Sequence, residues 1–233
     1  GGGEGGGQGG GGEGDGAAER PTGALLRLLQ LTMARELQET AAAQLVFRRN
    51  SIASKLCSCY AKAFGQALLC QVLQDPIQRI CDLSEVLGSE DCGLEVDPSR
   101  IGADGIPPAE LAQRLAAQQA ALAQAVSLVL TAVLAARLPS AMRTLCSLIW
   151  DAVERRFGKD THPTADGHGL DPARSDEQAD PDPPCAAQSA VSGILFLRFV
   201  VPCLAAPAAH GILAAVPSRA ASRGLVLVSK VGQ

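Results

Sequence analysis

The chain has 233 residues, 47% of them apolar, and a formal net charge of −4. This apolar content excludes a chain that is disordered throughout, and the length suits one domain of ordinary size with a sizeable core. No uninterrupted apolar stretch reaches the roughly 20 residues that a bilayer span needs, and no signal peptide opens the chain, so we expect a cytoplasmic protein without a transmembrane segment.

Two polar segments account for the negative charge. The first 16 residues hold 12 of the 25 Gly and three acidic residues, and residues 159–188 hold seven acidic residues, two basic residues and five Pro. Such segments bury too little apolar surface to offset the entropy of ordering them. We therefore expect a disordered Gly-rich tail over residues 1–20 and one folded domain over residues 21–233, with an acidic, Pro-rich loop inserted at residues 159–188. Outside the first 16 residues and this loop, the chain carries 18 basic and 14 acidic residues.

Helical spacing of apolar residues dominates the first part of the domain. Thr22 is placed to cap a first helix, in which apolar residues recur at every third or fourth position from Leu25 to Leu45. Ser51 is placed to cap a second helix, and the pair Asp75-Pro76 predicts a further helix that begins at the proline. Residues 88–106 hold four Gly and predict a loop.

The middle of the chain also favours helices. Pro107-Pro108 precedes a long segment rich in Ala, Leu and Gln that extends to about Leu138, where Pro139 interrupts it. The clearest helical pattern follows and stops at Gly158. Its apolar residues are Met142, Leu145, Cys146, Ile149, Trp150, Val153 and Phe157.

In the last part of the chain, the composition of Ile194–Val201 suits a buried strand as well as a helix, and periodicity cannot separate the two. This stretch lies within an apolar segment from Ser189 to Leu204, and Ser218 begins a final segment. The Asp-Gly pairs at 104–105 and 166–167 are not flanked by alternating apolar runs, so they do not predict hairpins. Because helical spacing surrounds the ambiguous stretch, we predict an all-α fold.

The residues that commonly carry chemistry do not form a site of their own. Most of the eight Cys lie in apolar helical stretches, which favours reduced thiols over disulfides. Cys57 and Cys59 point apart on a helix and no Cys or His pair follows at zinc spacing, so no metal site is predicted. No phosphate-binding or nucleophile-elbow motif is present, and the three His form no catalytic set. One Tyr, one Trp and the lack of a long basic tract also argue against nucleic-acid binding.

Four segments of the chain form one pattern when they are taken in order. They are V-F-R-R-N-S-I-A-S-K at 46–55, E-V-D-P-S-R at 95–100, S-G-I-L-F-L-R-F-V-V-P at 192–202, and R-G-L with S-K-V-G-Q at 223–233. The first resembles the arginine-finger segment L-F-R-G-N-S-L-A-S-K of Ras GTPase-activating (RasGAP) domains, and the third is similar to their F-L-R-x-x-x-P signature. The nearest likeness within the family is to neurofibromin. The resemblance extends from about residue 25 to residue 233 and implies a helical RasGAP-like domain.

The resemblance implies that the chain is not an enzyme by itself but completes the active site of a partner. By this likeness, Arg48 is an arginine finger that enters the site of a GTP-bound Ras-family GTPase, and Arg198 supports the finger loop through hydrogen bonds. The chain then needs no cofactor, because the partner holds GTP and Mg²⁺, and it approaches membranes only through the partner. The positions implied to contact the partner are Leu197, Lys230, Gln233 and Arg49.

The sequence also departs from the family pattern. Arg49 replaces a Gly, Val201 replaces the usual Asn before the signature proline, and the acidic loop is longer. The family continues with further helices beyond the position of Gln233, so we expect a domain truncated at its C-terminus. Two interpretations stay open: an activator that negatively regulates Ras signalling, favoured by Arg48 and Arg198, and a Ras-binding scaffold with weakened or lost activity.

Overall fold

The computed structural model describes residues 21–87, 94–101, 107–158 and 185–231. The predictions for the Gly-rich tail, for residues 159–184 of the acidic loop, for the Asp-Gly pairs and for Gln233 lie outside these residues. The last part of the predicted loop is wrong, because Cys185 caps a helix that begins at Ala186 and includes residues 186–188. Within them the chain forms helices and no strand, which confirms the all-α prediction. The elements are α1 (Gly23–Glu39), the 3-10 turn η1 (Ala43–Leu45), α2 (Ile52–Leu87), α3 (Pro108–Ala135), α4 (Ser140–Phe157), α5 (Ala186–Ser192), the π-helix η3 (Gly193–Val200), α6 (Val201–Ala205) and α7 (Arg219–Val231).

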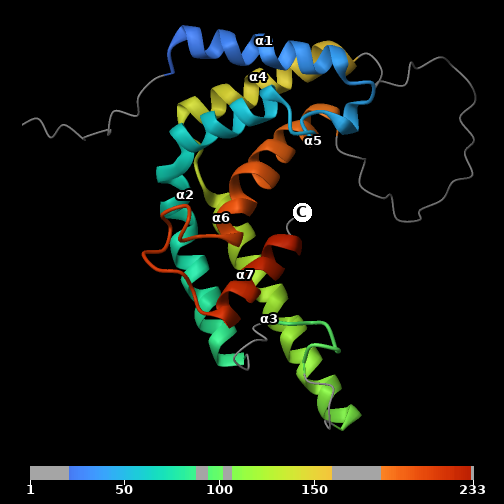
Figure 1. Ribbon diagram of the computed structural model, residues 1–233, viewed down its shortest axis with the longest axis vertical. Helices are drawn as coiled ribbons and strands as arrows, with labels where there is room; N and C mark the ends of the chain where they lie inside the picture. Colours follow the sequence, from blue (N-terminus) through green and yellow to red (C-terminus); the bar gives the residue numbers. More distant parts are fainter. Residues whose placement is uncertain (1–20, 88–93, 102–106, 159–184, 232–233) are drawn as a thin grey trace, which may run out of the picture.

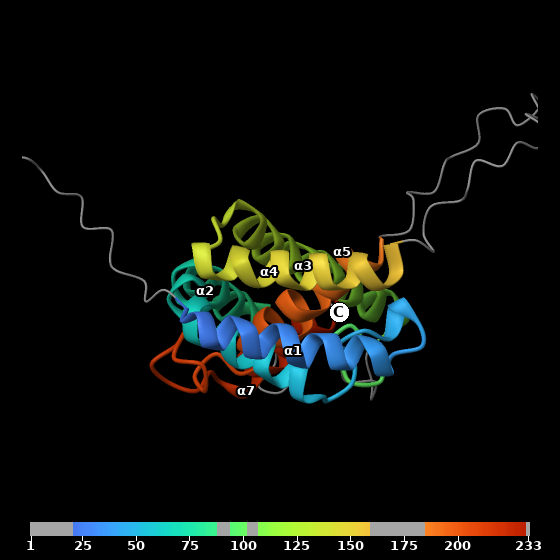
Figure 2. The same ribbon diagram turned by 90° about the horizontal axis from the view of Figure 1, so that it is seen from above.

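Helix α2 organises the molecule. It packs against α1, α3, α4, η3 and α7, so a large part of the core is built on its surface. Helices α1 and α4 lie side by side across one end of the molecule, and α2 runs away from them toward α3 at the other end (Figures 1 and 2). The continuous segment α5–η3–α6 descends from the α4 end along α2 to α7 (Figure 1).

The predicted helix starts agree with the structure at three positions. The Thr22 hydroxyl accepts the N–H of Leu25 at 3.4 Å, and the Ser51 hydroxyl accepts the N–H of Ser54 at 3.0 Å. The Ser218 hydroxyl accepts the N–H of Ala221 at 3.2 Å, just inside α7. Each hydroxyl satisfies a backbone donor that has no partner within its helix.

The predicted helix start at Asp75-Pro76 is wrong, because α2 continues through Pro76 without interruption. A proline inside a helix removes one hydrogen bond and costs about 3 kcal/mol. Here Leu73, Ile77 and Ile80 are fully buried on both sides of the proline. Their shared apolar face keeps the helix in one piece, because the burial of each such side chain stabilises by about 1.5–3 kcal/mol.

Two glycines allow helices to cross at short distance. A Cβ added at Gly65 of α2 would lie 2.5 Å from the ring tip of Phe199 in η3. A Cβ added at Gly224 of α7 would lie 3.2 Å from the Cβ of Ser84 in α2 and closer still to its hydroxyl. The two crossings fix η3 at one part of α2 and α7 at another.

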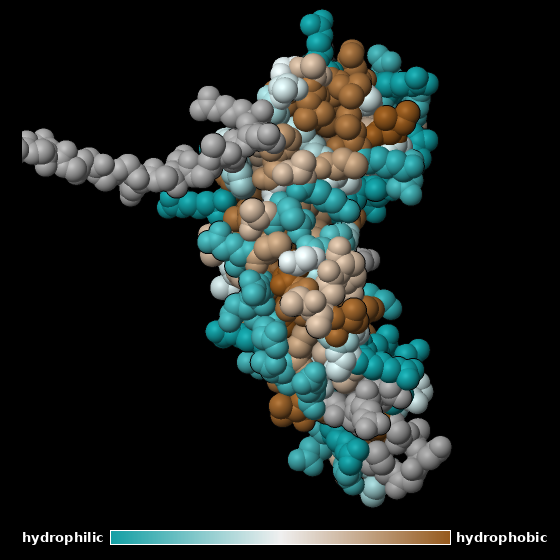
Figure 3. Space-filling model, turned by 60° about the vertical axis from the view of Figure 1, so that its left-hand side comes forward, coloured by the Kyte–Doolittle hydropathy of each residue, from teal (hydrophilic) through white to brown (hydrophobic). Residues whose placement is uncertain are grey.

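Apolar surface gathers at the end formed by α1 and α4 (Figure 3), where Leu28 and Leu31 of α1 are exposed. By length and hydropathy alone, α2, α3 and the helix Ala186–Ala205 could each cross a membrane, so the expectation of no transmembrane segment stays a prediction. The seven described Cys are free, with Cys57 buried and Cys59 exposed on opposite faces of α2.

Candidate functional site

The finger loop, residues 46–51, connects η1 to α2 and presents Arg48 at the surface. Val46 and Phe47 are buried, whereas Arg48, Arg49 and Asn50 are exposed. The N–H of Arg48 donates to the carbonyl of Leu45 at 3.3 Å, which closes a tight turn before the exposed arginine. The apolar side chains therefore anchor the loop and leave the cation free to reach outward.

Phe47 has an unusual backbone conformation for a bulky residue. Its φ is 55°, in the left-handed region that costs a non-glycine residue free energy. Among the described residues, Leu94 is the other non-glycine with a positive φ, so Arg49 does not adopt one. The replacement of the family's Gly by Arg49 therefore introduces no left-handed backbone strain.

Arg198 reaches the finger loop from η3, 150 residues further along the chain. Its Nε donates to the carbonyl of Phe47 at 3.1 Å, and its Nη2 donates to the carbonyls of Arg48 and Arg49 at 3.0 and 2.8 Å. Its Nη1 donates to Oδ1 of Asn50 at 3.4 Å. Three consecutive carbonyls thus converge on one guanidinium, and charged donors make strong hydrogen bonds of this kind. These are the contacts that the resemblance implies; the catalytic role of either arginine stays a prediction.

A second charged side chain, Glu36, also holds the loop, and it belongs to none of the four motifs. Glu36 lies on α1 and is 4% exposed. Its Oε1 accepts the N–H of Phe47 at 3.1 Å, and its Oε2 accepts the hydroxyl of Ser51. The available signal was a carboxylate within the apolar stripe of α1, between Met33 and Leu37.

The far end of the loop is fixed by serines at the start of α2. Ser51 and Ser54 cap each other, because the N–H of each donates to the hydroxyl of the other. The Ser54 hydroxyl also donates to the carbonyl of Arg49 at 2.8 Å. This carbonyl therefore accepts from Ser54 as well as Arg198, which restrains the backbone next to Arg48.

A groove of about 690 Å³ runs beside the finger loop. Its lining includes Arg48 and the buried Phe47 of the finger loop, Phe196 and Leu197 of η3, and the end of α5. Leu197 is 37% exposed, so it offers apolar surface next to the exposed arginine. The structure thus brings Arg48, Leu197 and Arg198 together at one groove.

The remaining predicted contact positions lie elsewhere or are not described. Lys230 is exposed in the last turn of α7 and does not line this groove. Gln233 lies outside the described residues. Val201 is buried at the start of α6, so an apolar residue suits its surroundings.

Cys57 lies within electrostatic reach of both charged groups that hold the loop. Its pKa is raised to about 12, first by burial and then by the Glu36 carboxylate, while a backbone hydrogen bond and the Arg198 guanidinium oppose this. The thiol is therefore protonated at neutral pH and is no nucleophile. No group of three or more Cys, His, Asp and Glu that could hold a metal ion occurs in the described part of the chain.

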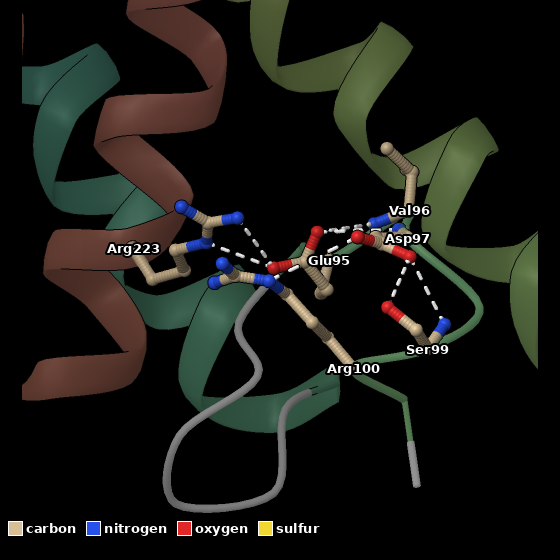
Figure 4. A network of polar contacts seen from close by, with 6 residues as sticks. All are labelled: Glu95, Val96, Asp97, Ser99, Arg100 and Arg223. Atoms are coloured by element: carbon tan, nitrogen blue, oxygen red, sulfur yellow. Dashed lines mark hydrogen bonds and ion pairs between the residues drawn. The ribbon is translucent and has the colours of Figure 1, made fainter. Parts of the chain in front are cut away.

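The second and fourth motifs meet at a separate polar network (Figure 4). Arg223 of α7 pairs with Oε2 of Glu95, at 2.8 Å from Nε and 2.7 Å from Nη2. The other oxygen of Glu95 accepts the N–H groups of Val96 and Asp97. The Glu95 side chain is only 3% exposed. Its contacts with Arg223 join residues 94–101, the connecting segment, to α7.

Comparisons with known proteins agree with the motifs. The sequence profile of the family described as "GTPase-activator protein for Ras-like GTPase" (RasGAP) matches residues 28–233. The chain is similar to the "Probable Ras GTPase-activating-like protein ngap" of Dictyostelium discoideum, with 25% identity over 214 residues, covering 91% of this chain and 20% of that protein. It is also similar to the "RasGAP-activating-like protein 1" of Mus musculus, with 26% identity over 202 residues, covering 85% of this chain and 22% of that protein. The chain spans about a fifth of the length of these relatives.

The family match includes the finger loop, the network of the connecting segment, η3 and α7. Proteins of this family activate a GTPase and are not themselves enzymes. The nearer likeness to neurofibromin stays a prediction, because neither of these relatives bears that name. By its profile match over residues 28–233, the chain belongs to the RasGAP family, the activators of Ras-like GTPases.

Proposed function

We propose that this chain accelerates GTP hydrolysis by a GTP-bound Ras-family GTPase, and that it does so by inserting Arg48 into the partner's site. The observation that carries the proposal is the finger loop: Arg48 is exposed, while the backbone around it is held by Arg198 and Glu36. A residue that acts inside another protein must protrude from a fixed base. The loop combines these two properties.

The chemistry of phosphoryl transfer explains why an arginine is suited to this position. Negative charge spreads over the oxygens of the transferred phosphoryl group, and a guanidinium supplies a planar set of donors with a charge that does not titrate away. Ras with its activating proteins is the well-known example, with an acceleration of about 10⁵-fold. GTP and Mg²⁺ belong to the partner, so the chain contributes no cofactor in this proposal. It acts in the cytoplasm and reaches membranes through its partner.

A Ras-binding scaffold without activity is the second candidate. The observation in its favour is the second exposed arginine, Arg49, where the family has Gly. A bulky cation beside the finger can obstruct the close approach that hydrolysis needs, without preventing binding. The absence of left-handed strain at Arg49 favours activation instead.

Single-turnover GTP hydrolysis by several Ras-family GTPases tests both candidates. We expect the wild-type chain to accelerate hydrolysis, Arg48→Ala to reduce the stimulated rate by at least about 10³-fold, and Arg49→Ala to change it by less than about threefold. Arg49→Ala is the matched control, because it removes the same charge one residue away. Binding without acceleration by the wild type would select the scaffold, and a loss confined to Arg49→Ala would assign the finger to Arg49.

A further inference from the structure

Phe47, the residue before the proposed finger, is held at both of its backbone polar groups by charged side chains. Its N–H donates to Oε1 of Glu36 and its carbonyl accepts from Nε of Arg198, each at 3.1 Å. Its φ of 55° is unfavourable for a phenylalanine. The two contacts therefore stabilise a conformation that this residue would rarely adopt alone.

Glu36 is buried, and both of its carboxylate oxygens have their partners in the finger loop. Oε1 accepts from the N–H of Phe47 and Oε2 accepts from the hydroxyl of Ser51. A buried carboxylate is costly unless it accepts hydrogen bonds, and these contacts offset that cost. Because Phe47 and Ser51 lie on either side of residues 48–50, one carboxylate joins the start of the exposed segment to its end.

We propose that Glu36 is a positioning residue for the arginine finger. It fixes the base of the loop across Phe47 and Ser51, and so determines the direction in which Arg48 leaves the surface. The inference rests on the proposed function, since a loop without a finger has nothing to position. A displacement of about 1 Å in a catalytic group can slow a reaction by about 10²-fold, so a loosened base has a measurable consequence.

A purely structural role for Glu36 makes a different prediction. If the carboxylate only stabilised the fold, its removal would reduce the folded fraction but leave the rate of the folded molecules at saturation unchanged. If it positions Arg48, the rate at saturation falls although the chain remains folded and still binds. The maximal single-turnover rate and the half-saturating concentration must therefore be measured separately.

Two substitutions separate the acceptor from the side-chain volume. Glu36→Met keeps an unbranched side chain of similar length but accepts no hydrogen bond, whereas Glu36→Gln keeps one oxygen acceptor for the N–H of Phe47. Glu39→Met is the matched control, because Glu39 lies on the same helix, is exposed, and pairs with Arg35. Amide hydrogen exchange of Phe47, followed by NMR, reports the loop directly and does not depend on a GTPase.

We expect Glu36→Met to lower the maximal stimulated rate by about 30- to 100-fold, to change the half-saturating concentration by less than about threefold, and to speed exchange of the Phe47 amide. Both the maximal rate and the Phe47 exchange rate of Glu36→Gln should lie between those of Glu36→Met and the wild type. Both values for Glu39→Met should match the wild type. A wild-type maximal rate in Glu36→Met, or equal losses in Glu36→Met and Glu36→Gln, would overturn the inference.

The controls distinguish this inference from the proposed function. If the wild type stimulates no GTPase, the proposed function fails; if the wild type stimulates and Glu36→Met does so equally, only the role of Glu36 fails. Should Glu36→Met not fold, Glu36→Gln carries the test, with a severalfold slower maximal rate and faster Phe47 exchange. Wild-type values for both measurements in Glu36→Gln would then contradict the role.

Discussion

The finger loop and the connecting segment 94–101 share two features and differ in the acceptor that each offers to an arginine. Each contains a buried apolar residue with a positive φ, Phe47 at 55° and Leu94 at 50°. Each receives an arginine from the C-terminal part of the chain, Arg198 in the first case and Arg223 in the second. Arg198 donates to backbone carbonyls and to the Asn50 amide, whereas Arg223 pairs with a carboxylate.

The choice of acceptor decides what each loop presents to its surroundings. At the connecting segment, the Glu95 carboxylate neutralises Arg223, and the pair joins two parts of the same molecule. At the finger loop, neutral carbonyls leave the charge of Arg198 in place next to Arg48 and Arg49. The first arrangement is suited to holding helices together, and the second to meeting an anionic group on a partner.

The largest expected effect in this comparison is that of Arg198→Ala on activity. Removal of the guanidinium takes a donor away from three carbonyls of the finger loop, of which only that of Arg49 keeps a second donor, the Ser54 hydroxyl. We expect the maximal stimulated rate to fall by about 10²-fold. The carbonyls of Arg48 and Arg49 are exposed and can bind water, whereas that of Phe47 is partly buried. The free energy of unfolding should therefore fall by only about 1–2 kcal/mol. Single-turnover hydrolysis and urea unfolding measure the two effects.

Arg198→Lys is the matched variant, because a lysine keeps the charge but lacks the planar set of donors that three carbonyls require. It should recover less than half of the lost activation free energy. Full stimulation by Arg198→Ala with an unchanged melting temperature would mean that these contacts play no part in the reaction.

Arg223→Ala should show the reverse pattern, with a loss of stability and little loss of activity. It leaves the buried Glu95 carboxylate without its ion pair, and breaking a fully buried pair costs about 3–5 kcal/mol. Because Arg223 is 25% exposed and Glu95 keeps two backbone N–H groups, we expect a smaller loss of about 2 kcal/mol in the free energy of unfolding. Urea unfolding measures it, and the maximal rate of the folded variant should stay within about threefold of the wild type.

The double variant Glu95→Gln with Arg223→Ala supplies the control, since it also removes the uncompensated charge. It should be more stable than Arg223→Ala alone. If Arg223→Ala instead lowered the maximal rate as much as Arg198→Ala, it would be wrong that the connecting segment only stabilises the fold while the finger loop acts on the partner.

The sequence predicted the helices well because their signals are local. Capping hydroxyls at Thr22 and Ser51 and the recurrence of apolar residues depend on neighbours in the chain, and the structure agrees with them. The error at Pro76 has a tertiary cause, since the proline is tolerated by packing on both sides of it. A local breaker is a weak signal where a long apolar face continues past it.

The site could be predicted only as far as motifs reach. The motifs identified Arg48 and Arg198 as candidate site residues. In the structure, the Arg198 guanidinium donates to the backbone carbonyl of Arg48. Glu36 belongs to no quoted motif, and its role depends on a contact across 11 residues to the N–H of Phe47. The conformation of Phe47 was equally inaccessible, because a positive φ at a phenylalanine follows from its surroundings and not from its own preference.

The smallest expected effects come from substitutions at Gly65 and Gly224, the two glycines at which helices cross. Gly65 lies against η3, which carries Arg198, and Gly224 lies against Leu94 of the connecting segment. In Gly65→Ala the new methyl group would press on Phe199, the neighbour of Arg198, whereas in Gly224→Ala it would press on Ser84 and Leu94. Overpacking costs about 1–3 kcal/mol and alanine gains about 1 kcal/mol of helix propensity, so each variant should lose only about 1 kcal/mol of stability.

Activity should distinguish the two glycine variants although their stabilities are similar. A shift of Phe199 moves the base of Arg198, so Gly65→Ala should lower the maximal stimulated rate by about threefold, whereas Gly224→Ala should leave it unchanged. Urea unfolding and single-turnover hydrolysis on the same preparations make the comparison. Equal rates in both variants would show that the finger loop tolerates movement of η3, and that its geometry depends on α1 and Glu36 more than on Arg198.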